Sequence, residues 1–446
     1  MSQINLKKNI AVSGGFRVVI LVLSFCVSWL SARYLGVEGK GRLSYLMTMG
    51  GFIWAVLGMG LNHSYPYLIR KNPDKRSDLY AWTLLQFAFE TLLFLAVGLG
   101  LIKFWNQVLS FDFTPLYMAL FVIYITFTKA VMQMQAFYIG VDKVFQSSMA
   151  HLINTGSCLL LLMAGFILVP SGDRFGYYLG LTVIGLAISL AYLSFGHRER
   201  ISISSMDISF IKHSYGFGMR AFVSMFLISL LVRADIVIVK RLLDYSQVGI
   251  YSIAAHVVDM LQVASNLVGS LLLAKLSDTA EETEKWQLMK KMLMLFSVFL
   301  LVGNLGFMLL GKYVLGIFFG LDFVPAYAVY LWLIPASFGL SFGSLFNNYL
   351  NSKGFPIVTI VIAGLALLLN VGLNYLMIPL WGINGAALAT SIAYLFWFFL
   401  IIAYEQKATS GRLLPHLIPK REDWRELYLS IRELLTQISK KKMGGI

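Results

Sequence analysis

Four basic side chains lie within stretches of sequence that are otherwise apolar: Arg17, Lys129, Arg220 and Arg233. A charged side chain near the centre of a bilayer costs several kcal/mol unless it faces a helix-bundle interior or a water-filled cavity, so such residues mark functional sites. Arginine and lysine donate charge-assisted hydrogen bonds to phosphate and carboxylate oxygens. The four residues therefore predict a cavity that binds an anionic cargo.

The composition of the chain indicates that lipid surrounds most of it. Of 446 residues, 58% are hydrophobic and 13% are charged, whereas soluble domains contain about 25% charged residues. A span needs about 20 mostly apolar residues. Twelve stretches meet this need: 10–31, 43–68, 79–102, 115–138, 148–169, 175–195, 214–239, 247–273, 291–311, 325–350, 356–378 and 381–403. We predict an all-α integral membrane protein with about 12 transmembrane helices.

The distribution of lysine and arginine predicts the orientation of these spans. If both termini are cytoplasmic, most basic residues of the loops and tail lie on the inner side, with Arg33, Lys40 and Arg42 of the first outer loop as exceptions. The net charge of +14 then reflects the inner-leaflet bias rather than nucleic-acid binding. Cys26 and Cys158 lie within spans, where we expect packing rather than a disulfide or a metal site.

The second half of the chain repeats features of the first at separations of 208 to 210 residues. The matching positions are Gly41 and Gly249, Ser44 and Ser252, Lys143 and Lys353, Pro170 and Pro379, and Gly176 and Gly385. Arg17 matches Arg220 if a short gap is allowed. Parallel repeats of six spans predict two lobes, 1–200 and 201–404, with a cargo site between them near mid-membrane. We expect residues 405–446 to form a basic amphipathic cytoplasmic tail that lies on the anionic inner leaflet, and docking on a partner is the alternative.

Three stretches in the same order resemble a known family. Ala32–Gly41, the region from Asp235–Val239 to Val248–Ser252, and Ile378–Ala387 are similar to segments of the Wzx-type flippases, polysaccharide transporters of the MOP superfamily. The resemblance implies MATE-like lobes that carry an undecaprenyl-diphosphate-linked oligosaccharide from the inner to the outer leaflet of the bacterial cytoplasmic membrane. The related lipid II flippases usually have fourteen spans, so this chain departs from them.

The resemblance also implies the cellular context of the chain. The product is a surface polysaccharide such as O-antigen, lipopolysaccharide or capsule. The partners are the lipid-linked oligosaccharide, membrane lipids, and a polysaccharide polymerase with other assembly proteins. We expect proton or sodium coupling, no cofactor and no nucleic acid. The sugars, the driving ion and the oligomeric state do not follow from the sequence.

Arg17 and Arg220 are the leading candidates for contacts to the cargo. As equivalent positions of the repeat, they could clamp a diphosphate between the lobes, because the planar guanidinium matches phosphate oxygens bidentately. The alternative for Arg17 is that its long side chain reaches the inner interface. Arg233 and Asp235 are two residues apart and do not share a helical face, so each needs a partner on another helix.

Lys129 has a competing structural interpretation. In span three, Thr83, Gln86 and Glu90 share one helical face, and Glu90 lies near mid-span, as Lys129 does in span four. The two charges could neutralise each other as a structural pair. If they do not, Lys129 faces the cargo path and Glu90 is a candidate for ion coupling.

Spans eight, ten and eleven carry further polar stripes. In span eight, the stripe consists of Ser252, His256, Asp259, Gln262 and Asn266. Asp259 and His256 are candidates for a proton or sodium site, and an interhelical hydrogen-bonded stripe is the alternative. Ser341 and Asn348 in span ten, with Asn370 and Asn374 in span eleven, are candidates for glycan contacts.

Two other classes of function compete with flipping. An enzyme is not expected, because there is no nucleotide-binding loop, no His-Glu-x-x-His and no large outer loop. A MATE-like multidrug antiporter for organic cations shares the fold. Its site should be anionic, with an acidic residue in the first span of a lobe, where this chain has Arg17 and Arg220.

Overall fold

The computed structural model describes residues 3–169, 172–196, 206–278, 282–352, 357–426 and 429, with the side chains of 3–14, 220, 263–278 and 352 outside the description. Its long helices are α1 (Gln3–Gly58), α3 (Arg76–Gly100), α5 (Pro115–Gly140), α6 (Val144–Leu168), α7 (Arg174–Phe195), α8 (Ile208–Leu242), α9 (Tyr245–Asp278), α10 (Glu282–Val314), α11 (Ala326–Ser352) and α12 (Ile357–Ala408). The short elements are α2 (Leu61–Lys71), η1 (Pro73–Lys75), α4 (Ile102–Leu109), η2 (Leu315–Phe319), η3 (Leu321–Phe323) and α13 (Leu413–Leu417).

The apolar stretches form helices because a backbone in hydrocarbon must satisfy its own hydrogen bonds. Within the described ranges, 9 helical segments are long and apolar enough to cross a membrane. Two of them, Gly15–Lys71 and Ile357–Ala408, each contain two predicted spans. The predicted span 247–273 lies in α9. The prediction of an all-helical, multi-pass membrane protein is confirmed. The cytoplasmic placement of both termini stays a prediction.

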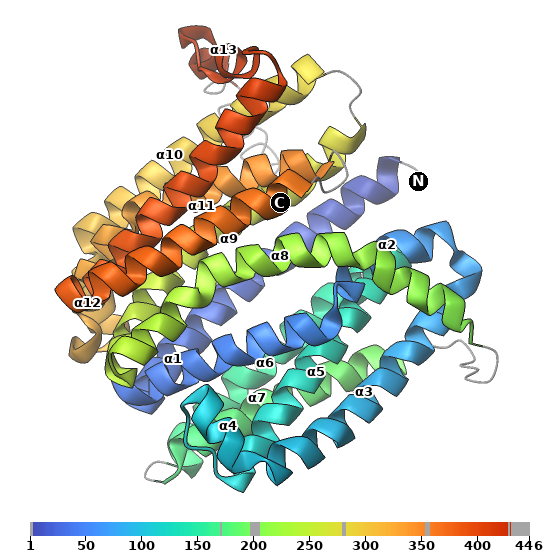
Figure 1. The fold of residues 1–446 in the computed structure, drawn as a ribbon, viewed down its shortest axis with the longest axis vertical. Coiled ribbons are helices and arrows are strands. Elements are labelled where there is room, and N and C mark those ends of the chain that lie inside the picture. Colours follow the sequence, from blue (N-terminus) through green and yellow to red (C-terminus); the bar gives the residue numbers. More distant parts are fainter. Residues whose placement is uncertain are drawn as a thin grey trace, which may run out of the picture.

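The first and last outer loops predicted from the sequence are single-glycine reversals rather than loops. Helix continues on both sides of Gly36, whose φ is 70°, and of Gly382, whose φ is 57°. Such positive φ values favour glycine, which has no Cβ atom. The expected loop 32–42 is therefore wrong: residues 37–58 form the second arm of α1, which runs back beside the core of the bundle (Figure 1).

Polar residues at helix starts explain where several spans begin. Thr114 accepts a hydrogen bond from the backbone N–H of Tyr117, and Pro115 occupies the first turn of α5. Asp173 and Asp207 cap α7 and α8 in the same way. A cap satisfies a backbone donor that the helix itself leaves free.

The helices form two groups, with α1–α7 in one half of the molecule and α9–α12 in the other (Figure 1). Helix α8 contacts both. Its C-terminal part contributes Leu231 to the larger apolar core, whereas Ile211 belongs to a smaller core built mainly from α2, α3, α5 and α7, with Ala150 of α6. Phe217 of α8 stacks on Tyr67 of α2, with ring centroids 4.8 Å apart. The packing of α8 thus joins the two halves.

The two halves also meet at a helix crossing between α1 and α9. A Cβ atom at Gly41 would overlap the Tyr245 carbonyl oxygen, and one at Gly249 would overlap the Val37 carbonyl oxygen. Residues 41 and 249, and likewise 37 and 245, are 208 positions apart, which is the separation of the predicted repeat. Equivalent positions of the two halves therefore exchange equivalent backbone contacts.

The described part of the C-terminal tail packs against the end of α10. Leu413 and Leu417 are buried, and the His416 ring lies 5.2 Å from the Trp286 ring. Lys290 Nζ is 2.6 Å from Asp423 Oδ1, and this bond lowers the pKa of Asp423. Most of the predicted amphipathic face lies outside the described residues, so its contact with the leaflet stays a prediction.

Candidate functional site

A polar cavity lies between the two halves of the molecule, beside the α1–α9 crossing. Its volume is about 360 Å³. It is lined from α1 by Ser28, Lys40, Ser44, Met47, Thr48, Gly51, Phe52 and Trp54, from α8 by Ser229, Arg233 and Ile236, and from α9 by Ser252, His256 and Asp259. We call it the central cavity. Three pairs of its lining residues, Ser44 and Ser252, Thr48 and His256, and Gly51 and Asp259, are 208 positions apart, so positions that match in the predicted repeat line one cavity.

A second cavity of about 290 Å³ adjoins the central cavity on the side of the first half. Its lining is mostly uncharged and comes chiefly from α1, α6 and α7. The lining consists of Ser24, Val27, Ser28, Ser31, Lys40, Asn154, Thr155, Cys158, Tyr178, Thr182 and His256. We call it the side cavity. Ser28, Lys40 and His256 line both cavities, so the two spaces share one wall.

Lys40 is the basic residue at the junction of the two cavities. Its Nζ donates a hydrogen bond to Ser31 Oγ at 2.8 Å. Among the residues that the structure describes, no carboxylate lies within ion-pair distance of this amine. An ammonium group has three N–H donors, so two remain available. A desolvated cation without a counter-ion favours the binding of an anion.

His256 lies opposite Lys40, on α9. Its Nε2 atom is inaccessible to solvent and has no hydrogen-bond partner within the described ranges. Buried polar atoms in native proteins are nearly always hydrogen-bonded, so this atom is able to bond to a group that enters the cavity. His256 therefore adds an unused hydrogen-bonding group to the wall that both cavities share.

Arg233 and Asp259, predicted separately as a cargo contact and an ion-coupling residue, form an ion pair. Arg233 Nη2 lies 2.7 Å from Asp259 Oδ2, and the side chains are 35% and 29% exposed to the central cavity region. In this conformation each charge neutralises the other. Neither is a free charge, which the sequence could not reveal because they lie on neighbouring helices.

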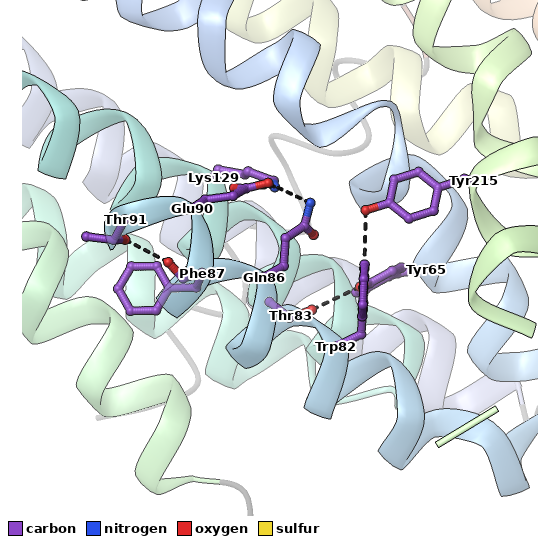
Figure 2. A network of polar contacts seen from close by, with 9 residues as sticks. All are labelled: Tyr65, Trp82, Thr83, Gln86, Phe87, Glu90, Thr91, Lys129 and Tyr215. Carbon is purple, nitrogen blue, oxygen red and sulfur yellow. Dashed lines mark hydrogen bonds and ion pairs between the residues drawn. The ribbon is translucent and has the colours of Figure 1, made fainter. Parts of the chain in front are cut away.

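Lys129 and Glu90 form an ion pair with each other, which is the structural one of the two interpretations of the sequence. Lys129 Nζ lies 2.6 Å from both carboxylate oxygens of Glu90, and Gln86 donates to Glu90 Oε1 at 2.8 Å (Figure 2). The Lys129 side chain is 3% exposed, and neither charged residue lines the central or side cavity. In this conformation Lys129 faces neither of these two cavities, and Glu90 is occupied by its partner.

Of the two arginines in the predicted clamp, the structure describes the side chain of one. Arg17 is an exposed residue of α1, in the turn that places Phe16 against Phe145, and it does not line either cavity. Arg220 lies in α8, but its side chain lies outside the described residues. The clamp between Arg17 and Arg220 therefore stays a prediction.

Three of the four predicted glycan contacts are fully packed inside the second half. Ser341 donates to Gln262 at 2.7 Å, Asn374 donates to Asn370 Oδ1 at 3.1 Å, and Asn370 donates to Thr390 at 3.5 Å. All three are at most 1% exposed. Asn348 is half-buried on α11 and does not line the two cavities. Sugar contacts by these four residues stay a prediction for another conformation.

Asp235 is buried among hydrogen-bond donors of the second half. It accepts from Tyr251 Oη at 2.5 Å, from Thr390 Oγ1 at 3.3 Å and from the backbone N–H of Ile236 at 2.7 Å. This carboxylate therefore ties α8 to α9 and α12. Tyr251 on α9 and Thr390 on α12 are thus the partners on other helices that the sequence predicted for Asp235.

Lys40 is the residue that reasoning from sequence missed. We expected it in an outer loop because Glu38-Gly39-Lys40-Gly41-Arg42 is short and polar. The reversal at Gly36 instead makes it part of a helix. A signal was present, since Lys40, Ser44 and Thr48 follow a spacing of four, which places them on one helical face. That face is the one that lines the central cavity.

Several contacts between the halves lie at the end of the bundle near Gly36. Arg33 of α1 donates to the carbonyl oxygens of Ile317 and Phe318 in η2 at 2.7 and 2.8 Å. Trp29 and Phe25 place their rings against Phe318, with centroids 5.2 and 5.5 Å apart. Together with the glycine crossing, these contacts join the two halves at this end of the bundle.

Membrane-spanning helices in two halves, with a polar cavity between them, fit a membrane transporter. Solved structures share this fold. With a MATE family multidrug transporter of the MOP superfamily in an inward-facing conformation, the TM-score is 0.71 at 13% identity, covering 90% of this chain and 98% of that one. With a Vibrio cholerae MATE transporter, the TM-score is 0.68 at 13% identity, covering 92% of this chain and 99% of that one. With a MATE family transporter in an outward-facing conformation, the TM-score is 0.65 at 11% identity, covering 91% of this chain and 96% of that one.

A family model for polysaccharide biosynthesis proteins matches residues 6–273, which is more than half of the chain. The chain belongs to this family, which confirms the resemblance noted in the sequence. No curated protein matches the sequence. The likeness to MATE transporters shows the fold alone, because the identities are low.

Proposed function

We propose that this protein flips an undecaprenyl-diphosphate-linked oligosaccharide from the inner to the outer leaflet of the bacterial cytoplasmic membrane by alternating access, without covalent chemistry. The observation that carries the proposal is the Lys40 ammonium in the cavity between the halves, where no carboxylate neutralises it among the described residues. A diphosphate supplies the missing counter-charge. The membership of the chain in a polysaccharide biosynthesis family supports the saccharide part of the cargo.

The charges of the cavity favour an anion over the organic cation of an antiporter. Asp259, the acidic residue that lines the central cavity, is already paired with Arg233. The charge left over belongs to Lys40 and is positive. A cavity for organic cations needs the reverse arrangement, so the antiporter is the weaker proposal.

The cycle follows from which end of the bundle is closed. If the termini are cytoplasmic, the Gly36 end faces outward, and the contacts of Arg33 with η2 close the outer side. The cargo diphosphate then enters from the inner leaflet and binds at Lys40. Rocking of the halves breaks the Arg33 contacts and releases the cargo outward. Surface polysaccharide assembly proteins would receive the flipped lipid.

Charge reversal at Lys40 tests the proposed function. We expect Lys40→Glu to reduce flipping of a lipid-linked oligosaccharide in proteoliposomes to background, because a carboxylate repels the diphosphate. Lys40→Arg, which retains the charge, should retain part of the activity. Lys103→Glu is a matched control, because Lys103 is exposed and lies outside both cavities. Flipping at the parental rate by Lys40→Glu, with normal gel-filtration behaviour, contradicts the proposal.

The Arg233–Asp259 pair offers a route to ion coupling. Protonation of Asp259, or a sodium ion on it, would release Arg233 to the diphosphate. We expect Asp259→Asn to bind the cargo about tenfold tighter, since releasing one charge-assisted contact is worth about 1.4 kcal/mol or more. The same variant should no longer respond to an imposed proton or sodium gradient. A parental gradient response in Asp259→Asn would remove this residue from the coupling.

A further inference from the structure

We propose that the side cavity is a carbohydrate subsite, which holds the first sugar of the cargo while the diphosphate lies at Lys40 and His256. The inference rests on the proposed flippase function and adds the place of the glycan and the side chains that contact it. It assigns the sugar to α1, α6 and α7 of the first half, rather than to the packed amides of α11 and α12.

The lining of the side cavity has the chemistry of a sugar site. Its polar groups are hydroxyls and one amide, carried by Ser24, Ser28, Ser31, Asn154, Thr155, Tyr178 and Thr182. Lys40 and His256 stand at the wall shared with the central cavity. Neutral donors and acceptors match the neutral hydroxyls of a sugar without the desolvation cost of burying a charge. Val27 and Cys158 give the wall an apolar part, as ligand sites commonly have.

The hydrogen bonds already made by these side chains leave defined groups for a ligand. Thr155 Oγ1 donates to the His151 carbonyl at 3.1 Å, and Thr182 Oγ1 donates to the Tyr178 carbonyl at 2.7 Å. With its hydrogen used within its own helix, each hydroxyl oxygen is left as an acceptor. Sugar hydroxyls can donate to these two oxygens.

Asn154 supplies the complementary donor. Its Oδ1 atom lies 3.9 Å from Cys158 Sγ, whereas no partner for its Nδ2 is present in the part of the chain that the structure describes. The amide N–H groups can therefore donate to a sugar oxygen. Acceptors on α6 and α7 and a donor on α6 together match the alternating roles of neighbouring hydroxyls on one sugar ring.

The order of the two cavities matches the order of groups in the cargo. A diphosphate joins the first sugar to the lipid. Lys40 and His256 lie between the side cavity and the part of the central cavity that contains Arg233. A diphosphate at this shared wall places its sugar on the side-cavity face, and its second phosphate toward Arg233.

Binding of three lipids to the full-length protein in nanodiscs tests the subsite. The probes are undecaprenyl diphosphate and the same lipid carrying one N-acetylglucosamine or one galactose. We expect the parent protein to bind at least one glycosylated lipid about tenfold tighter than the sugar-free lipid, a difference of about 1.4 kcal/mol. Asn154→Leu and Thr182→Val should each remove most of this gain and leave binding of the sugar-free lipid unchanged.

The controls separate the subsite from packing and from the flippase proposal. Thr182→Ser retains the hydroxyl and should retain the gain. Thr91→Val removes a hydroxyl that is bonded to its own helix in the same way but lies outside the side cavity, and should also retain it. Equal binding of all three lipids by the parent, or a full gain in both Asn154→Leu and Thr182→Val, overturns the subsite. Failure of the parent to bind any of the lipids overturns the flippase proposal instead.

Discussion

Lys129→Met should destabilise the protein by about 3–5 kcal/mol, because it leaves the Glu90 carboxylate buried without its counter-charge. Glu90 is 11% exposed as a side chain, and its remaining described side-chain donor is Gln86. The loss should appear as a lower melting temperature of the detergent-solubilised protein, measured by fluorescence-detected gel filtration. Glu90→Gln should have a similar effect, since it leaves the lysine unpaired.

The double variant Glu90→Gln/Lys129→Met distinguishes structure from transport. Removing both charges leaves no buried ion, and replacing a whole buried ion pair is often neutral for stability. We therefore expect the double variant to recover most of the parental melting temperature and to flip cargo. A double variant that is stable but does not flip would instead assign Lys129 or Glu90 to the transport path.

Gly41→Val should have the second large effect, because the new side chain would overlap the Tyr245 carbonyl oxygen at the α1–α9 crossing. Overpacking typically costs about 1–3 kcal/mol, and here the obstacle is backbone rather than a flexible side chain. Gly249→Val should behave alike, since it meets the Val37 carbonyl oxygen. We expect both variants to give little monodisperse protein and a lowered melting temperature.

Gly58→Ala is the matched control for the crossing. It lies on the same helix, and a Cβ atom there meets no atom within 4 Å. It should retain the parental melting temperature. If Gly41→Val and Gly249→Val were as stable as Gly58→Ala, the close approach of α1 and α9 would be wrong.

The sequence predicted the helices well because hydrocarbon forces apolar stretches into helices. The prediction from sequence was wrong at residues 32–42. The polar residues there suggested a loop, whereas a helix begins directly after Gly36. A single positive φ value replaces a whole loop there. No composition rule distinguishes that glycine from the others, so Lys40 was assigned to the surface.

The candidate site was harder to predict than the fold. The stripe Ser252, His256 and Asp259 was identified by its spacing, and all three residues line the central cavity. The ion pairs between charged side chains were harder to predict. Arg233 and Asp259 are on neighbouring helices, and their contact depends on how each helix is rotated, which periodicity alone does not give. For Glu90 and Lys129, similar depth in the membrane was enough to suggest the pair.

The glycine crossing has a consequence for how such a protein could arise. Each half gives one carbonyl and one glycine, so two identical, unjoined six-helix chains could form the same contact as a symmetric dimer. Fusion of the two chains into one would then allow the sequences of the two halves to diverge. Lys40 has Val248 as its counterpart 208 positions on, and the counterparts of His256 and Asp259 are Thr48 and Gly51. Symmetric backbone contacts thus surround a cavity whose chemistry differs between its two sides. The first half contributes Lys40, which has no carboxylate partner among the described residues, and the second half contributes His256 and Asp259.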